Sequence, residues 1–83
     1  MMASAPAAEA SSSRRCTHRG HAIETRSSHK GTYWHAILLV RGPKDSTWSQ
    51  HACQGRYETE DAAHTAATQI GRLLVNFQLD QLF

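Results

Sequence analysis

Little in this chain marks it as secreted, membrane-spanning or stabilised by disulfides. It has 83 residues with only two cysteines and two prolines. A secretory signal needs a basic start followed by an apolar stretch, but the first 13 residues are rich in Ala and Ser, and the basic residues come after them. The longest apolar run, Ala36 to Val40, is far shorter than the roughly 20 residues of a spanning helix. We therefore expect a cytoplasmic protein without membrane contact, in which Cys16 and Cys53 are free thiols.

The chain also lacks a strong net charge. Nine Lys and Arg against seven Asp and Glu give a formal charge of +2 at pH 7, whereas dedicated nucleic-acid binders usually have a strongly basic surface. The excess is local, because residues 1–20 contain three arginines against Glu9, while residues 21–83 contain six basic and six acidic residues. We expect residues 1–20 to form a disordered Ala/Ser-rich arm with a basic end, and residues 21–83 to form a single neutral domain.

Three segments of this domain have the pattern of β-strands. Residues 22–28 alternate weakly between apolar and polar side chains, as in an edge strand. Residues 33–41 are the strongest strand signal, and because both faces carry large apolar groups they predict a central strand. Residues 47–57 are interpreted as a third strand, bent or bulged at Gly55.

The clearest element is a C-terminal helix. Thr59 can cap its first turn, and Glu60 and Asp61 complement the positive end of the helix dipole. Gly71 costs about 1 kcal/mol relative to Ala inside a helix, which indicates a close contact there. The predicted buried stripe follows i, i+3, i+4, i+7 spacing: Ala63, Ala66, Ala67, Ile70, Leu73, Leu74 and Phe77. The predicted fold is α+β: a three-stranded antiparallel sheet with one C-terminal α-helix packed on one face.

The helix and the central strand both carry apolar residues beyond those of one small core. Trp34, Ala36, Leu38 and Val40 are expected to face the helix, which leaves the alternate residues of that strand outside. A second helical pattern, formed by Val75, Leu79 and Leu82, lies off the predicted stripe and indicates a binding partner. A frayed C-terminal tail that folds back onto the domain also accounts for it. The candidate protein interface comprises Tyr33, Ile37, Leu39, Val75, Leu79, Leu82 and Phe83.

Six histidines and two cysteines invite a metal-site hypothesis. Cys16, His18 and His21 lie close in sequence, and His51 and Cys53 share one face of a predicted strand. This spacing matches no paired-ligand zinc pattern, so scattered surface histidines are the preferred interpretation, and we expect no metal or other cofactor. The serines form no nucleophile elbow and the glycines no phosphate loop. We therefore expect a protein that is not an enzyme and has no small-molecule substrate.

One family resemblance lies in the second half of the chain. Trp34-His-Ala36-Ile37, followed by Gly55-Arg-Tyr57 and the acidic, Ala-rich start of the helix, resembles the DNA-binding domain of plant ethylene-response factors and the arm-binding domain of phage integrases. The resemblance covers about half the chain and implies a three-stranded sheet, backed by a helix, whose outer face reads the DNA major groove with Arg and Trp. The basic first strand of that family is absent here. Many small bacterial β-β-β-α proteins look similar too, so the resemblance specifies fold better than function.

Two functional hypotheses follow. The apolar outer face favours a small interaction module that binds another protein or self-associates, most simply as a symmetric dimer. The alternative is nucleic-acid binding through the basic arm and the rim of the sheet. Its contact residues would be Arg14, Arg15, Arg19, Arg26, Lys30, Arg41, Lys44 and Arg56.

Overall fold

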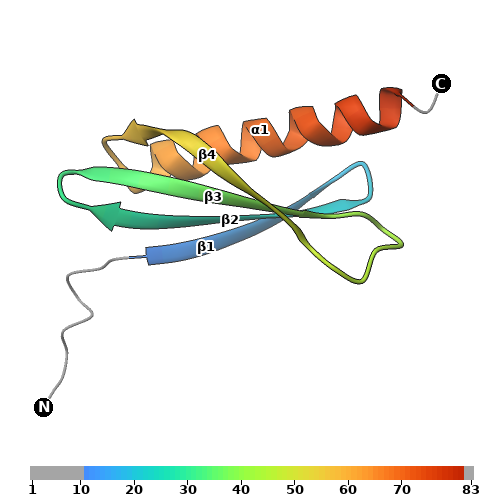
Figure 1. Cartoon of the computed structure of the whole chain (residues 1–83), viewed down its shortest axis with the longest axis horizontal. Helices are drawn as coiled ribbons and strands as arrows, with labels where there is room; N and C mark the ends of the chain where they lie inside the picture. Colours follow the sequence, from blue (N-terminus) through green and yellow to red (C-terminus); the bar gives the residue numbers. More distant parts are fainter. Residues whose placement is uncertain (1–10, 82–83) are drawn as a thin grey trace, which may run out of the picture.

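The computed structural model describes residues 11–81 as a sheet backed by one helix (Figure 1). The strands are β1 (Ser11–His18), β2 (His21–Lys30), β3 (Tyr33–Arg41) and β4 (Ser49–Tyr57). They pair antiparallel in sequence order, so β2 and β3 are central and β1 and β4 are the edges. The helix, α1 (Glu60–Asp80), then crosses one face of this sheet. Within residues 11–81, no helix has the length and apolar character that crossing a bilayer requires.

The sheet has four strands, so the prediction of three strands is wrong. The additional strand is β1, which lies in the segment assigned to the arm by its composition. It pairs along its whole length with β2, from Ser11 opposite Ser28 to His18 opposite His21. Its residues, Ser-Ser-Ser-Arg-Arg-Cys-Thr-His, have neither the β-branched and aromatic content nor the apolar alternation that predicts a strand. The predicted arm residues 1–10 lie outside the described residues.

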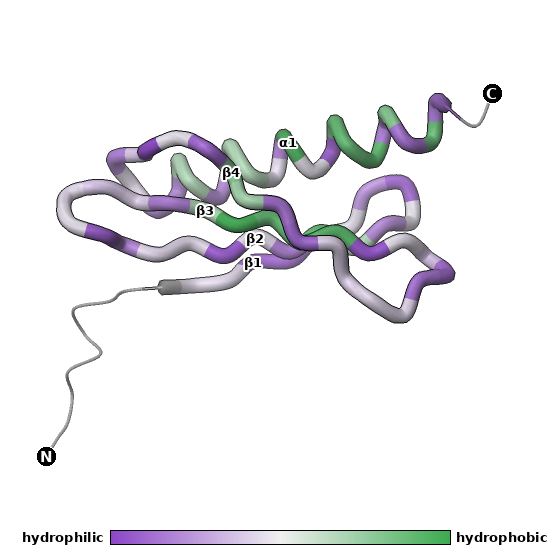
Figure 2. Tube along the Cα trace, viewed as in Figure 1, coloured by the Kyte–Doolittle hydropathy of each residue, from purple (hydrophilic) through white to green (hydrophobic). Residues whose placement is uncertain are grey.

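The core lies between α1 and the two central strands. Ile23 on β2 and Ala36, Leu38 and Val40 on β3 are buried there, with Trp34 partly buried against them. The prediction that these β3 residues face the helix is therefore confirmed. Figure 2 shows hydrophobic residues concentrated along β3 and in the C-terminal half of α1.

The start of α1 and the bulge in β4 follow from local sequence. The Thr59 side chain accepts a hydrogen bond from the Ala62 N–H at 3.0 Å, which confirms the predicted cap. In β4, the register shifts beside Trp34, and Gly55 has a φ of 130°, a conformation that favours glycine. The predicted irregularity at this glycine is confirmed.

The helix is rotated relative to the predicted stripe. Ile70, Leu73 and Phe77, expected in the core, are 36%, 67% and 61% exposed. Val75, expected on a second surface stripe, is fully buried. The rotation follows from size, because the buried face is built mainly from small residues that let the helix approach the sheet closely. The buried positions are Ala63, His64, Ala67, Gly71 and Val75.

Candidate functional site

No helix or strand within residues 11–81 covers the face of the sheet away from α1, which holds a row of four residues across all strands. Arg15 on β1 is opposite Glu24 on β2, which is opposite Leu39 on β3, which is opposite Gln50 on β4. We call this side of the sheet the outer face. Leu39 was predicted to be exposed on it, but only 8% of this residue is accessible.

Trp48, just before β4, covers part of this face. The guanidinium carbon of Arg15 lies 5.2 Å from the centroid of the Trp48 ring, and that of Arg41 lies 4.9 Å from it. Arg15 belongs to β1 and Arg41 to β3, so the indole contacts the arginines of two strands that are not neighbours in the sheet. Such cation–π contacts contribute about 0.5–1 kcal/mol each at exposed sites. They hold two guanidinium groups and one aromatic ring in a fixed arrangement.

Glu24 is a buried carboxylate that orients two arginines of the outer face. Its Oε1 accepts a hydrogen bond from Arg15 Nε at 2.9 Å, and its Oε2 accepts one from Arg26 Nε at 2.6 Å. The bonds from Arg26 and Arg15 hold the pKa of Glu24 below its ordinary value, although burial acts in the opposite direction. The side chains of Arg15 and Arg26 remain 66% and 59% exposed. Their positive charge is therefore oriented but still accessible to a ligand.

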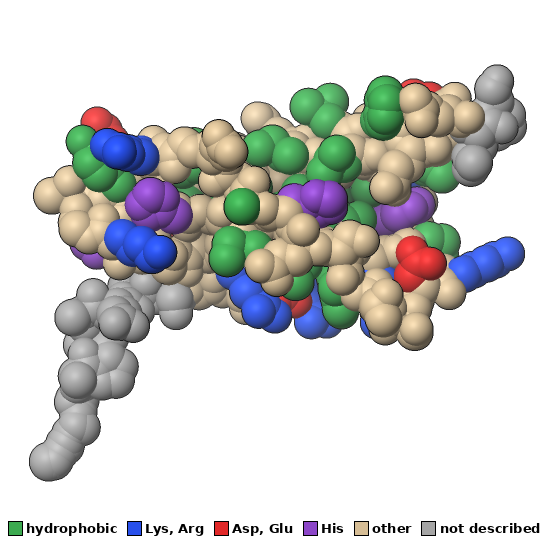
Figure 3. Space-filling view, in the orientation of Figure 1, with side chains coloured by type: hydrophobic (Ala, Val, Ile, Leu, Met, Phe, Trp, Pro, Cys, Tyr) green, Lys and Arg blue, Asp and Glu red, His purple; other side chains and the backbone are tan. Residues whose placement is uncertain are grey.

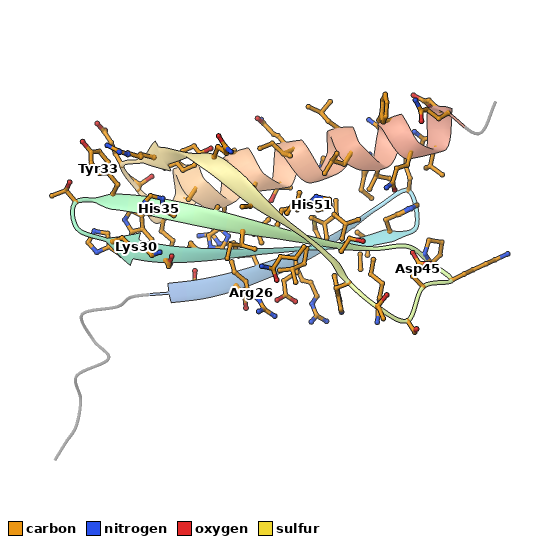
Figure 4. The ribbon with its side chains drawn as sticks, in the orientation of Figure 1. Arg26, Lys30, Tyr33, His35, Asp45 and His51 are labelled. Carbon is orange, nitrogen blue, oxygen red and sulfur yellow. The ribbon has the colours of Figure 1, made fainter. Side chains whose placement is uncertain are left out.

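A second aromatic–cation pair lies near the β2–β3 hairpin. The guanidinium carbon of Arg56 lies 5.3 Å from the centroid of the Tyr33 ring, and Tyr33 is 41% exposed. Figure 4 places Lys30 and His35 close to Tyr33 at this end of the sheet, and shows Arg26 pointing away from α1. Of the described strand residues on the outer face, one is a carboxylate and five are cations: Glu24 against Arg15, Arg26, Lys30, Arg41 and Arg56.

The remaining predicted nucleic-acid contacts lie elsewhere. Arg14 forms an ion pair with Asp61 on α1. Arg19 donates a hydrogen bond to Asn76 at 3.0 Å and lies 3.7 Å from Asp80. Lys44 lies in the exposed β3–β4 loop. The basic residues thus do not act as one arm: β1 alternation sends Arg15 to the outer face and Arg14 to the helix side.

The predicted protein-interface residues do not share one surface. Tyr33 and Ile37 are exposed on the outer face, whereas Val75 is in the core and Leu79 packs partly against it. Leu82 and Phe83 lie outside the described residues. The sequence reasoning also missed Trp48 as a site residue, because its neighbours in the sequence are uncharged and its cationic contacts, Arg15 and Arg41, come from β1 and β3.

On the helix side, His64 is the centre of a buried polar network. Ser12 donates its hydroxyl proton to Glu60 Oε2 at 2.6 Å, so His64 Nε2 must donate to Ser12 Oγ, 2.8 Å away. His64 Nδ1 then accepts from the Thr25 hydroxyl at 2.6 Å. A serine beside a histidine suggests a nucleophile and its base, but His64 is only 1% exposed, so a substrate cannot reach the ring. The network instead joins α1 to β1 and β2.

We expect the stability of the fold to decrease between pH 7.5 and pH 5.5 because of His64. Burial first, and then the positive charge of Arg14, lower its pKa below the ordinary value of 6.5, against Glu60 and Asp61, which raise it. The unfolded chain therefore binds a proton near pH 6.5 that the folded chain rejects, and the free energy of unfolding falls by up to about 1.4 kcal/mol per pH unit below that value.

Urea denaturation at pH 7.5, 6.5 and 5.5 measures this effect. The His64→Gln variant should be less sensitive to pH than the wild type over this range. Glu24 and Asp61 have pKa values lowered from 4.5 and 3.8. Their protonation therefore changes stability mainly below pH 4.5, outside the pH range of this experiment. An equal pH dependence in both proteins would contradict the assignment to His64.

The cysteines and histidines form no metal centre within residues 11–81. No group of three or more His, Cys, Asp or Glu side chains could hold an ion there. Cys16 and Cys53 are free thiols on the opposite edge strands, and burial raises the pKa of Cys53. The outer face is therefore the main candidate site, since its guanidinium groups can bind anionic oxygens and stack on planar rings. No protein-family model, curated protein or solved structure matches this chain.

Proposed function

We propose that the outer face of the sheet binds single-stranded nucleic acid. The observation that carries the proposal is the five-to-one excess of cations over carboxylates on this face, with two aromatic residues between them. Arginines neutralise phosphates, and aromatic rings stack on bases. Trp48 and Tyr33 each lie against an arginine, so cationic and stacking groups alternate along the sheet.

The distribution of charged residues supports nucleic-acid binding, although the net charge of the chain is small. On the opposite side of the molecule, Arg14 and Arg19 pair with Asp61 and Asp80, so their charges are largely compensated. Lys30, Arg41 and Arg56 on the outer face have no ion pair among residues 11–81, so they add to a local positive potential there, while Lys44 and Arg72 lie elsewhere. A neutral domain average therefore conceals a cationic surface.

Single strands suit this surface better than duplex DNA. Between the cations, the outer face exposes Ile37 and Tyr33, and Ile37 offers no hydrogen bond to a base edge in the major groove. Every unpaired base, however, presents a π-face that can pack on apolar or aromatic side chains. The same cations weaken the case for a protein partner on the outer face, because the centre of a protein interface is depleted in charge.

Removing the arginines that contact aromatic rings should weaken binding most clearly. Arg41 and Arg56 have no ion pair among residues 11–81, so their loss leaves no described carboxylate unpaired. We expect the Arg41→Ala/Arg56→Ala double variant to raise the Kd for a fluorescein-labelled oligo(dT) about tenfold at low salt. The slope of log K against log salt should become shallower by about 1.4, or about 0.7 per lost phosphate contact.

Fluorescence anisotropy of the full chain at two salt concentrations measures both quantities. Arg72→Ala is the matched control, because Arg72 is an exposed arginine on α1, away from the outer face. The control should bind as the wild type does. The proposal fails if the wild type does not bind at low salt, if Arg72→Ala weakens binding as much as the double variant, or if duplex DNA binds more tightly than the single strand.

A further inference from the structure

The register of the sheet arranges the residues of the outer face in five rows along β2 and β3. Residues that lie opposite each other on neighbouring strands form one row, and the next row on the same face begins two residues further along each strand. We number the rows from the end of the sheet near Trp48 to the β2–β3 hairpin. In this order, their β2 and β3 members are Ala22 with Arg41, Glu24 with Leu39, Arg26 with Ile37, Ser28 with His35, and Lys30 with Tyr33.

The spacing of these rows fits an extended strand of nucleic acid. Two residues of a β-strand advance about 6.6 Å, so the four steps from row 1 to row 5 cover about 26 Å. Stacked nucleotides of one strand in a duplex follow each other at about 3.4 Å. In a strand whose bases are separated, so that each lies on the protein instead of on the next base, the spacing reaches about twice that value and matches one nucleotide to each row.

Charged and uncharged side chains lie on different sides of the outer face. Arg15 extends row 2 on β1, and Arg26 and Lys30 lie in rows 3 and 5 on β2. On the other side of row 3, β3 and β4 carry Ile37 opposite Ala52. Figure 3 shows Lys and Arg side chains along the side of the molecule away from α1. A single strand is divided in the same way, because its phosphates follow one edge and its bases the other.

An aromatic–cation pair lies at each end of this series of rows. Trp48 lies against Arg41 of row 1, and Arg56 lies against Tyr33 of row 5. A ligand that contacts both pairs must cover all five rows, whereas a shorter ligand reaches only one of them. The two pairs therefore set the length of ligand that makes full use of the face.

Given the single-strand binding proposed above, we propose that the outer face takes an unstacked, pyrimidine-rich segment of about five nucleotides, one to each row. Its phosphates lie over β1 and β2, and its bases lie over β3 and β4. Ile37 and Tyr33, which are exposed between the cations, then each pack against a separate base. The ligand is thus defined by its length and by weak base stacking, which the positive charge of the face alone does not specify.

The preference for pyrimidines follows from the row spacing. Neighbouring bases about 6.6 Å apart cannot stack on each other, because stacked bases are about 3.4 Å apart. Adenines stack strongly along a free single strand, so a run of adenines loses these contacts when it binds. Thymines stack weakly and lose little. Sequence preferences of this kind come from stacking strength rather than from hydrogen bonds to base edges.

The length of the segment can be measured with fluorescein-labelled oligo(dT) of two to twelve nucleotides and the full chain at low salt. In fluorescence anisotropy, (dT)5 should bind at least about tenfold more tightly than (dT)3, because only the longer strand reaches both aromatic–cation pairs. Beyond five nucleotides, the affinity should rise only with the number of ways to place the segment, which gives (dT)8 about a fourfold gain over (dT)5.

The role of the bases is tested at constant length. We expect (dA)5 to bind at least about fivefold more weakly than (dT)5. An abasic strand with the same number of phosphates should bind at least about tenfold more weakly than (dT)5, because it keeps the charge and lacks the bases.

A variant at one end of the face tests the arrangement in rows. Tyr33→Ala should weaken the binding of (dT)5 at least about fivefold but that of (dT)3 at most about twofold, since (dT)3 can still bind at the Trp48 end. Phe77→Ala is the matched control, because Phe77 is an exposed aromatic residue on α1, and it should change neither affinity. Circular dichroism verifies that both variants are folded.

Failure of the arrangement in rows is distinguishable from failure of single-strand binding. If no single strand binds at low salt, both are wrong. Three results would leave single-strand binding in place and overturn the arrangement in rows. They are an affinity that rises by the same factor for every nucleotide added beyond five, equal affinities for (dA)5 and (dT)5, and an equal loss of (dT)3 and (dT)5 binding in Tyr33→Ala.

Discussion

Replacing His64 with alanine is expected to lower the free energy of unfolding by about 3 kcal/mol. The substitution leaves a cavity in a fully buried position and removes a partner from two hydroxyl groups, those of Ser12 and Thr25. A cavity and unsatisfied buried polar groups each cost on the order of 1–3 kcal/mol. Urea denaturation at pH 7.5 measures the loss. His51→Ala is the control, because His51 is exposed, and it should change stability by less than about 0.5 kcal/mol.

The loss should be concentrated in β1. This strand has almost no apolar side chains of its own, and the Ser12–His64 bond is one of its few links to α1. Hydrogen exchange of His64→Ala should therefore show faster exchange at the β1 amides than at those of β3. Uniform loss of protection in both strands would contradict a specific role of this network in holding β1.

Gly71→Val is expected to destabilise the fold by about 3 kcal/mol, and Gly71→Ala by about 1 kcal/mol. A Cβ atom at this position would lie 2.9 Å from Leu38 Cδ1 and 3.1 Å from Ile23 Cγ2, which are both in the core. Overpacking of this kind typically costs 1–3 kcal/mol, which exceeds the roughly 1 kcal/mol that alanine gains in helix propensity.

Two comparisons separate crowding from other effects of the Gly71 substitutions. Thr65→Val places the same side chain on an exposed position of α1 and should change stability by less than about 0.5 kcal/mol. Shortening the crowded neighbour should also compensate, so Gly71→Ala/Leu38→Val should be more stable than the sum of the single variants predicts. Strict additivity would show that contact with Leu38 is not the cause.

Local signals were sufficient to predict the elements whose structure depends on local sequence. The Thr59 cap, the apolar β3 and the glycine at the β4 bulge are set by neighbouring residues. The strand β1 was missed because its stability comes from its ladder with β2 and from contacts to α1, which have no periodic signature. Its turn also has a weak signal, since Arg19 adopts a positive φ before Gly20.

The rotation of α1 could not be read from helical periodicity alone. Two apolar stripes compete on this helix, and the larger residues, such as Leu73 and Phe77, suggest the buried one by hydrophobicity. Which stripe is buried depends on how closely the helix approaches Leu38 of β3. That distance is defined only once the sheet is packed. Gly71 is the sequence signal of that close contact, because a glycine inside a helix costs stability that a tight neighbour can explain.

The candidate site was only partly predictable for a related reason. The composition shows the number of cations, but the strand β1 decides that Arg15 joins the outer face. The contact of Trp48 with Arg15 and Arg41 also joins residues far apart in the sequence. A site assembled from four strands and a loop can be recognised only when the register between them is known.

The sequential order of the strands sets how the chain can fold. Each strand pairs with its neighbour along the chain, so every ladder closes a short loop at a small entropic cost. Contacts that join the ends of the domain, such as His18 to Asn76, 58 residues apart, depend on elements that are already in place. The hairpins of β2, β3 and β4 can therefore form early. Because the contacts of β1 with α1 join distant parts of the chain, we expect them to form after the hairpins.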